Sequence, residues 1–428
     1  MSLPQSSAPN RSRDFWLVLA PGALALAPYL AYHPLFSRLY WFGDEFDLID
    51  QIDRLGFWHW TALAFAENFV PLFKVLWGGS VLAFGGSYAG MIAVVWLTHA
   101  LNVALLGRLM RACGLAWAPV LAAQVVFGLA PSNLETLAWS VQWSAMLSVT
   151  FMLLALDSFF RRPFGPAPVG WTAASALSFS RGVLTGFLLA AASLWPAGIA
   201  GQSSLRKRAG YAAACILPSI GVALLIAILV PGGNHRHMEG HWCEAAQYGA
   251  WYYFLNPTHA LFGIDSVGPR TVIILGILKV TLVVGSLVRS RGHARTLFAL
   301  LMAFDLGNAL LLGIGRYHTG LPTAMSSRYQ YASLLACLPG AAFWFSLQLK
   351  RIPVPVASRT FMFSSLLASA ALVLCLQWRA DLDPFTLWRG TDSRRILLVD
   401  PAHSQAVPGY PGFPMERARE LIAKYNLH

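Results

Sequence analysis

Asp44 and Glu45 are the residues of this chain whose type and spacing are best suited to acid–base chemistry. They open a run of four acids within seven residues, in a chain of 428 residues that contains only 19 Asp and Glu. A carboxylate partly shielded from water has a raised pKa and acts as a general base toward a hydroxyl or an amine. The alternative is a solvated loop whose acids do no chemistry, and we expect that role for Asp47, Asp50 and Asp53.

Four arginines in predicted external segments offer a second kind of chemistry. The planar guanidinium donates two parallel hydrogen bonds and stays charged, which suits a phosphate. An arginine at a membrane boundary is also often an anchor to lipid headgroups, and this alternative stays open for each one. Two of them flank a segment that contains His318 and precedes Tyr329, which favours phosphate binding there. The four are Arg181, Arg236, Arg316 and Arg328.

The segment 234–244 contains three His, two Glu and one Cys, which are types of metal ligand. It matches no zinc motif, because Glu239 stands at the wrong position for the His-Glu-x-x-His pattern. Two hypotheses follow: a divalent metal site, or a loop that folds over a substrate cleft and contributes His237 to binding. We favour the loop and predict no definite cofactor.

Glu67 and Asn68 precede a short apolar segment and form a polar pair that could return toward Asp44. The alternative is a helix cap, with Asn68 at the cap and Pro71 in the first turn. We count both residues among the candidate substrate-binding residues.

The composition determines which elements must position these residues. The chain is 56% hydrophobic and 12% charged, whereas soluble proteins carry about 25% charged residues. Apolar stretches of about 20 residues, the length that crosses a bilayer, recur along the chain. Backbone exposed to lipid must satisfy its own hydrogen bonds, so we predict an all-α integral membrane protein. The basic residues lie in short clusters between the stretches, which indicates cytoplasmic loops rather than a nucleic-acid partner.

Eleven spans with a cytoplasmic N-terminus satisfy every basic cluster. The first is interpreted as a retained helix, and a signal peptide is the alternative. An amphipathic helix is expected on the outer surface at 69–84. The external loops are 34–86, 231–269 and 315–328, and a small extracytoplasmic tail, 380–428, follows the membrane domain, 1–379. The predicted spans are 15–33, 87–108, 115–130, 138–158, 169–180, 182–200, 210–230, 270–288, 296–314, 329–349 and 357–378.

The order of these segments resembles that of the GT-C superfamily of polytopic membrane glycosyltransferases, including its uncharacterised bacterial members. An acidic pair opens the first external loop (42–46), and a Glu-Asn-Phe-Val-Pro-Leu segment (67–72) leads into a surface helix. Two further segments, 133–139 and 326–329, are similar to recurrent segments of bacterial members. The resemblance covers most of residues 1–379.

The resemblance implies an inverting glycosyltransferase of the plasma (inner) membrane that uses a polyprenyl-phosphate-linked sugar. By position, Asp44 matches the catalytic base and Glu45 its neighbour, while Arg316, His318 and Arg328 match ligands of the lipid phosphate. The acceptor would be a glycan, a lipid or a protein of the cell envelope. A transporter or flippase of lipid-linked glycans is the alternative, as is a polymerase or ligase that acts at the same outer face.

Overall fold

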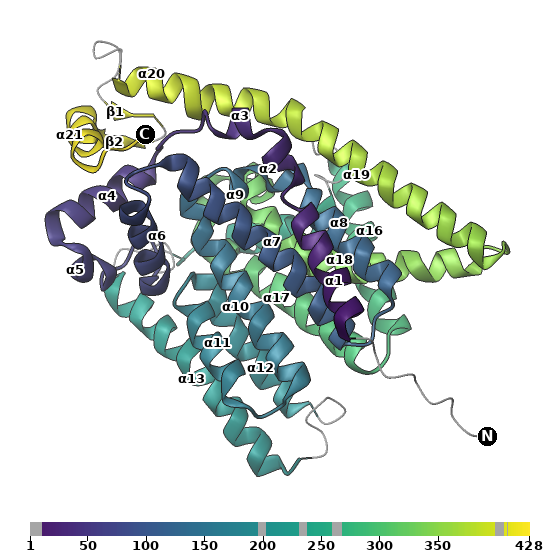
Figure 1. The fold of residues 1–428 in the computed structure, drawn as a ribbon. Helices are drawn as coiled ribbons and strands as arrows, with labels where there is room; N and C mark the ends of the chain where they lie inside the picture. Colours follow the sequence, from purple (N-terminus) through teal and green to yellow (C-terminus); the bar gives the residue numbers. More distant parts are fainter. Residues whose placement is uncertain (1–10, 196–202, 231–237, 259–267, 399–405, 409) are drawn as a thin grey trace.

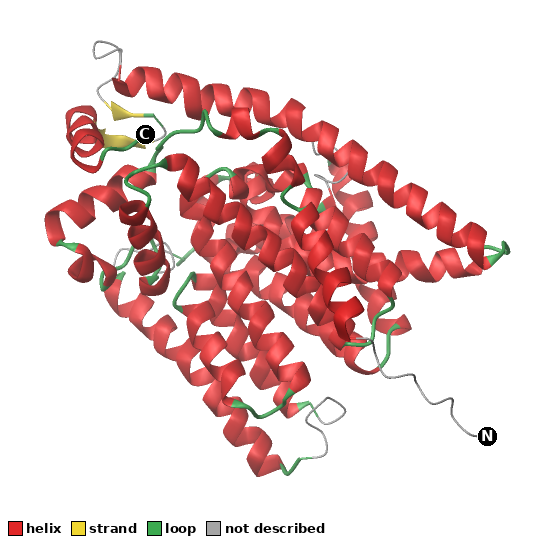
Figure 2. Cartoon of the chain, viewed as in Figure 1, coloured by secondary structure: helices red, strands yellow, loops and turns green. Residues whose placement is uncertain are grey.

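The structure is a computed structural model that describes residues 11–195, 203–230, 238–258, 268–398, 406–408 and 410–428 (Figure 1). Within these ranges nearly all regular structure is helical (Figure 2). Two short strands, β1 (Ala406–Val407) and β2 (Tyr410–Pro414), pair as an antiparallel hairpin near the C-terminus. The predicted all-α membrane class is confirmed at this level.

Seven of the described helices are long and apolar enough to cross a membrane, which makes the chain a membrane-embedded protein. A bent pair, α8 (Trp117–Leu129) with the following turn to Leu137, raises this number to eight if it forms one broken span. The seven are α7 (Tyr88–Ala112), α10 (Trp143–Arg161), α13 (Leu205–Leu229), α16 (Pro269–Arg289), α17 (Gly292–Arg316), α18 (Ser327–Arg351) and α19 (Val356–Thr386).

The other predicted spans contain helices too short to meet that test. The first is broken in two near Leu24, while the fifth and sixth have eleven residues each. The count of eleven spans therefore stays a prediction. These shorter helices are α1 (Arg11–Leu24), α2 (Ala27–Ala31), α3 (His33–Phe36), α11 (Pro166–Ala176) and α12 (Leu184–Leu194).

Buried polar side chains tie the long helices together inside the bundle. On α7, His99 contacts the Tyr331 hydroxyl of α18 through Nδ1 (3.1 Å) and the Gly128 carbonyl of α8 through Nε2 (3.1 Å). Asn102 donates to the same hydroxyl (3.0 Å). Both His99 ring nitrogens and the Asn102 amide nitrogen find partners on other helices, as is usual for polar groups buried away from water. These contacts fix α7, α8 and α18 relative to one another.

The first external loop is a set of three helices rather than an open loop: α4 (Asp44–Leu55), α5 (Phe57–Thr61) and α6 (Pro71–Ala83). The predicted surface helix corresponds to α6, but Lys74 on it is fully buried and donates to the carbonyls of Trp60 and Leu63 (2.9 Å each). Asn68 does not cap α6, whose N-cap residue is Val70. The side-chain oxygen of Asn68 accepts instead from the backbone N–H of Ser180 (3.3 Å).

The C-terminal segment is not a separate appendage, because it folds back onto the first loop (Figure 1). Arg417 donates to Asp50 (2.6 Å) and to Asp53 (2.7 Å), and Lys424 also pairs with Asp53. These two acids, expected to be solvated, therefore anchor the tail to α4. Beyond α19 the tail contains a π-helical turn, η7 (Leu387–Asp392), then α20 (Ser393–Leu398), the hairpin and α21 (Met415–Tyr425).

The predicted external loop 231–269 also contains a helix, α14 (Trp242–Leu255), which packs against α17. Its aromatic residues Tyr248 and Tyr252 are fully buried. They form part of a small hydrophobic core. Short helical turns complete the fold: η1 (Pro131–Asn133), α9 (Leu134–Leu137), η2 (Ser140–Gln142), η3 (Ser180–Val183), η5 (Tyr317–Thr319) and η6 (Leu321–Met325).

Candidate functional site

A cavity of about 370 Å³ lies where the first loop meets the ends of η3, α17 and α18. Seven of the ten site residues predicted from the sequence line it, although they come from segments far apart in the chain. This convergence makes the cavity the candidate functional site. The seven are Asp44, Glu67, Asn68, Arg181, Arg316, Arg328 and Tyr329.

Asp44 is the first residue of α4 and lines the cavity. The preceding residue, Gly43, has φ 60° and ψ −127°, a conformation that side-chain-bearing residues rarely adopt. Burial raises the pKa of Asp44, and the positive charges of Arg316, Arg328 and Arg389 partly oppose this rise. The helix N-terminus also favours a negative charge. A partly buried carboxylate that faces cations is suited to accept a proton from a bound hydroxyl.

Arg181 and Arg328 bring guanidinium groups into the cavity with unused donors. Arg181 is 4% exposed, and its Nε and Nη1 have no hydrogen-bond partner among the described residues. Nε of Arg328 is likewise buried without a partner in the described part of the chain. Leaving a buried donor unpaired costs about 1–3 kcal/mol, and more for a charged group. The arrangement is that of a site prepared for an anion.

Glu135 fixes the position of Arg328. Its Oε2 accepts from the Ser327 hydroxyl (2.8 Å) and from the Arg328 backbone (3.2 Å), and its Oε1 lies 3.9 Å from the guanidinium. Glu135 thereby caps the start of α18, nearly two hundred residues later in the chain.

Glu45 lies behind the cavity rather than in its wall. It is completely buried and accepts from the Phe42 backbone (2.7 Å), the Tyr88 hydroxyl (3.1 Å) and both the backbone and hydroxyl of Ser140. Burial raises its pKa to about 7, although the charge of Arg389 and these hydrogen bonds oppose the rise. In this structure Glu45 holds the start of α4, and thereby Asp44, against α7 and η2.

Of the two predicted histidines, the one that the structure describes, His318, does not line the cavity. His318 lies on η5, where it is exposed and packs edge-on against Tyr317, with ring centroids 5.8 Å apart. His237 lies outside the described residues. Within the part of the chain that the structure describes, no group of three or more His, Cys, Asp or Glu residues is arranged to hold a metal ion.

Several polar or aromatic residues of the cavity wall were missed from the sequence, among them Trp139, Gln142 and Asn308. Asn308 is three residues after Asp305 on α17 and therefore shares its helix face. That spacing was the available signal, because two polar residues on one face of an apolar helix need a partner or a ligand. Nothing comparable marked the other two.

Arg389 was also missed, because the tail was treated as separate from the membrane domain. It is 2% exposed, and its guanidinium lies 4.3 Å from the Phe42 ring and 5.1 Å from the ring of Trp139. Its Nε and Nη2 have no hydrogen-bond partner among the described residues. Arg389 thus adds positive charge directly behind the wall that carries Asp44.

An ion pair inside the bundle is connected to the cavity. Lys279 of α16 contacts Asp305 of α17 at 2.8 Å, and both are fully buried. Tyr252 donates to Asp305 (2.9 Å) and accepts from Asn308 (2.7 Å), which lines the cavity. Their network holds α14, α16 and α17 together beneath the cavity.

Comparison of the chain with known protein families, with curated proteins and with solved structures gives no match.

Proposed function

We propose that this protein is a membrane glycosyltransferase that transfers a sugar from a polyprenyl-phosphate-linked donor to an acceptor of the cell envelope. One observation carries the proposal: Asp44, Arg181, Arg316 and Arg328 line one cavity. The Asp44 carboxylate is suited to accept a proton, and the three arginines are suited to bind a phosphate.

In the proposed reaction, Asp44 accepts the proton of the acceptor hydroxyl while the oxygen attacks the anomeric carbon of the donor sugar. The bond between that carbon and the phosphate oxygen breaks, and the polyprenyl phosphate leaves with the bonding electrons. The buried guanidinium donors stabilise the negative charge that grows on the leaving phosphate. Attack opposite the leaving group inverts the anomeric configuration.

The finer topology belongs to the same proposal. We infer eleven spans in a GT-C-like arrangement, a cytoplasmic N-terminus and a site at the extracytoplasmic face of the plasma membrane. The basic clusters between spans support this orientation. The cavity lies at the end of the bundle opposite Lys350 and Arg351, which terminate α18.

The test is transfer of a labelled sugar from a polyprenyl-phospho-sugar by the purified protein. Loss of a general base costs about 10²–10⁴-fold in rate, so Asp44→Asn should lose at least a hundredfold. The matched control is Asp47→Asn, the same substitution one turn later, at a residue that does not line the cavity. It should stay within a few-fold of wild type. Full activity of Asp44→Asn would refute the proposed base.

A transporter of lipid-linked glycans remains the second candidate, because Lys279 and Asp305 form a charged pair within the spans. A transport pathway needs polar groups that can exchange partners. Here Lys279 donates to Asp305, to the Asn256 carbonyl (2.7 Å) and to Ser333 (3.3 Å), so all three of its donors are used. This closed arrangement favours a structural role for the pair. A polymerase or ligase would use the same cavity, and two bound carrier lipids in a structure would distinguish it.

A further inference from the structure

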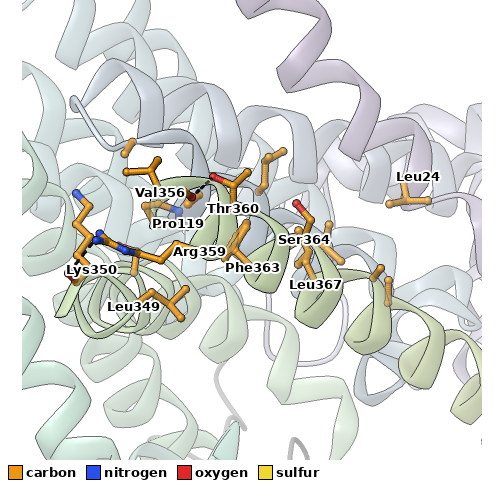
Figure 3. Close-up of a pocket in the computed structure, with 17 residues that line it drawn as sticks. Leu24, Pro119, Leu349, Lys350, Val356, Arg359, Thr360, Phe363, Ser364 and Leu367 are labelled. Carbon is orange, nitrogen blue, oxygen red and sulfur yellow. Dashed lines mark hydrogen bonds between the residues drawn. The ribbon is translucent and has the colours of Figure 1, made fainter. Parts of the chain in front are cut away.

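A second, larger cavity opens on the side of the bundle between α8, α18 and α19 (Figure 3). Its volume is about 640 Å³, and most of its wall is apolar, formed by residues such as Leu24, Pro119 and Phe363. We call it the lateral groove. Over this stretch α19 is largely exposed, with Val356 at 74% and Leu366 at 48%.

Two cations stand together at one end of the lateral groove. Figure 3 shows Lys350 and Arg359 there, while Ser364 and Leu367 lie further along α19. The Arg359 guanidinium is held in place by the backbone carbonyls of Val354 (2.9 Å) and Lys350 (3.5 Å). No Asp or Glu is among the residues that line the groove. This end of the lateral groove therefore carries the positive charges of Lys350 and Arg359, and no acidic residue of the described wall neutralises them.

Beyond Arg359 the groove is about as long as one membrane leaflet is thick. Its lining on α19 runs from Val356 to Ala371, and the part from Arg359 to Ala371 measures roughly 18 Å at about 1.5 Å per residue. One leaflet of the hydrocarbon core is about 15 Å thick. An occupant with a charged head at Arg359 and an apolar chain toward Ala371 would match both the charge and the length.

We propose that the lateral groove binds an anionic phospholipid, with the phosphate between Lys350 and Arg359 and an acyl chain along α19. A phosphate complements the two cations, and the Thr360 and Ser364 hydroxyls on the same wall are near the level expected for the glycerol esters. The bound lipid occupies the space between α19 and the bundle. This inference does not depend on the proposed glycosyl transfer.

The proposed lipid is different from a sugar donor bound at the Asp44 cavity. Helix α18 lines that cavity at Arg328, in its first turn, and reaches the groove at Lys350. The separation along the helix is roughly 33 Å, from about 1.5 Å per residue. This is about the full thickness of the hydrocarbon core, so the two headgroups belong to opposite leaflets.

The experiment is native mass spectrometry of the purified full-length protein, titrated with phosphatidylglycerol or with phosphatidylcholine of identical acyl chains. We expect tighter binding of phosphatidylglycerol to wild type. A basic residue near an anionic headgroup raises the affinity for the lipid about fivefold. The double variant Lys350→Gln/Arg359→Gln should therefore bind phosphatidylglycerol roughly thirtyfold more weakly than wild type. The control, Arg289→Gln/Arg291→Gln, removes a basic pair at the end of α16 that does not line the groove, and it should retain wild-type affinity.

A second variant tests the apolar wall. Ala368 lines the groove on the exposed α19, so Ala368→Trp should fill the groove without disturbing the folded core. We expect weaker binding of both lipids to this variant, in contrast to the charge variant. Equal affinity of wild type for the two lipids would overturn the proposal, as would an equal loss in the control. A dimer that Ala368→Trp dissociates would assign the groove to a second copy of the chain instead.

Discussion

Replacement of Arg181 by methionine tests whether the cavity is built for an anion. The Arg181 side chain is 4% exposed, and two of its nitrogen atoms have no hydrogen-bond partner among the described residues. Each unpaired buried donor costs about 1–3 kcal/mol. Methionine has a similar length and no donors, and can keep the contact with the Phe179 ring, which lies 5.1 Å from the guanidinium. We therefore expect Arg181→Met to leave the stability of the ligand-free protein unchanged or to raise it by about 1–3 kcal/mol.

The same substitution should remove the stabilisation that an anion provides. A ligand at about one hundred times its Kd stabilises the folded state by about 2.7 kcal/mol. The assay is the apparent unfolding temperature in detergent, measured with a short-chain prenyl phosphate and with the corresponding prenyl alcohol. For the wild type, the phosphate should raise this temperature and the alcohol should not. For Arg181→Met, the phosphate effect should shrink strongly.

Two results would refute this reasoning. The first is a large loss of stability in ligand-free Arg181→Met, which would mean that the guanidinium supports the fold. The second is an equal phosphate effect in variant and wild type, which would mean that the anion binds elsewhere. Ser180→Ala, at a neighbouring lining residue without a charge, is the control and should retain the phosphate effect.

Three further outcomes are expected. If Asp44 is the base, activity rises as the pH passes through its raised pKa. Arg316→Gln should shift this rise in the pH–rate profile to higher pH, because the Arg316 charge lowers the pKa of Asp44. An unshifted profile would contradict the electrostatic interaction between Arg316 and Asp44. Lys279→Met should destabilise the protein by about 3–5 kcal/mol, because Asp305 stays buried and uncompensated, whereas adding Asp305→Leu should recover most of this loss in thermal unfolding. Arg417→Ala should loosen the tail by about 1 kcal/mol after solvent screening, measured as severalfold faster hydrogen exchange in α21.

The long helices could be predicted because length and hydropathy are local properties. The span predicted at 329–349 corresponds to α18 at Ser327–Arg351. A long apolar segment in a membrane forms a helix because its backbone must satisfy its own hydrogen bonds. Helix α14 was assigned to a loop because its fourteen residues are too few to span and lie among His and Glu. Its burial depends on α17, which the local pattern does not encode.

The site was predictable by residue type but not by arrangement. Asp44, Arg316 and Arg328 stood out because charge is scarce in an apolar chain. The separation of Asp44 from Glu45 could not be predicted, since adjacent residues on a helix point about 100° apart and only the packing decides which one is buried. No local pattern around Glu45 indicates that α7 and η2 supply the donors that hold it.

The tail makes long-range contacts that give the acids of α4 a structural role that could not be predicted from the local sequence. Asp53 looked like a solvated acid, yet hydrogen bonds from Lys424, Arg417 and Tyr425 hold its pKa at about 2. A carboxyl group whose pKa is lowered on folding stabilises the folded form above its usual value near 4, and that contribution disappears only as the pH falls from about 4 to 2. These contacts tie the tail to α4, and the tail places Arg389 behind the wall that carries Asp44. A variant that undocks the tail should consequently alter the acid limb of the activity as well as the stability of α21.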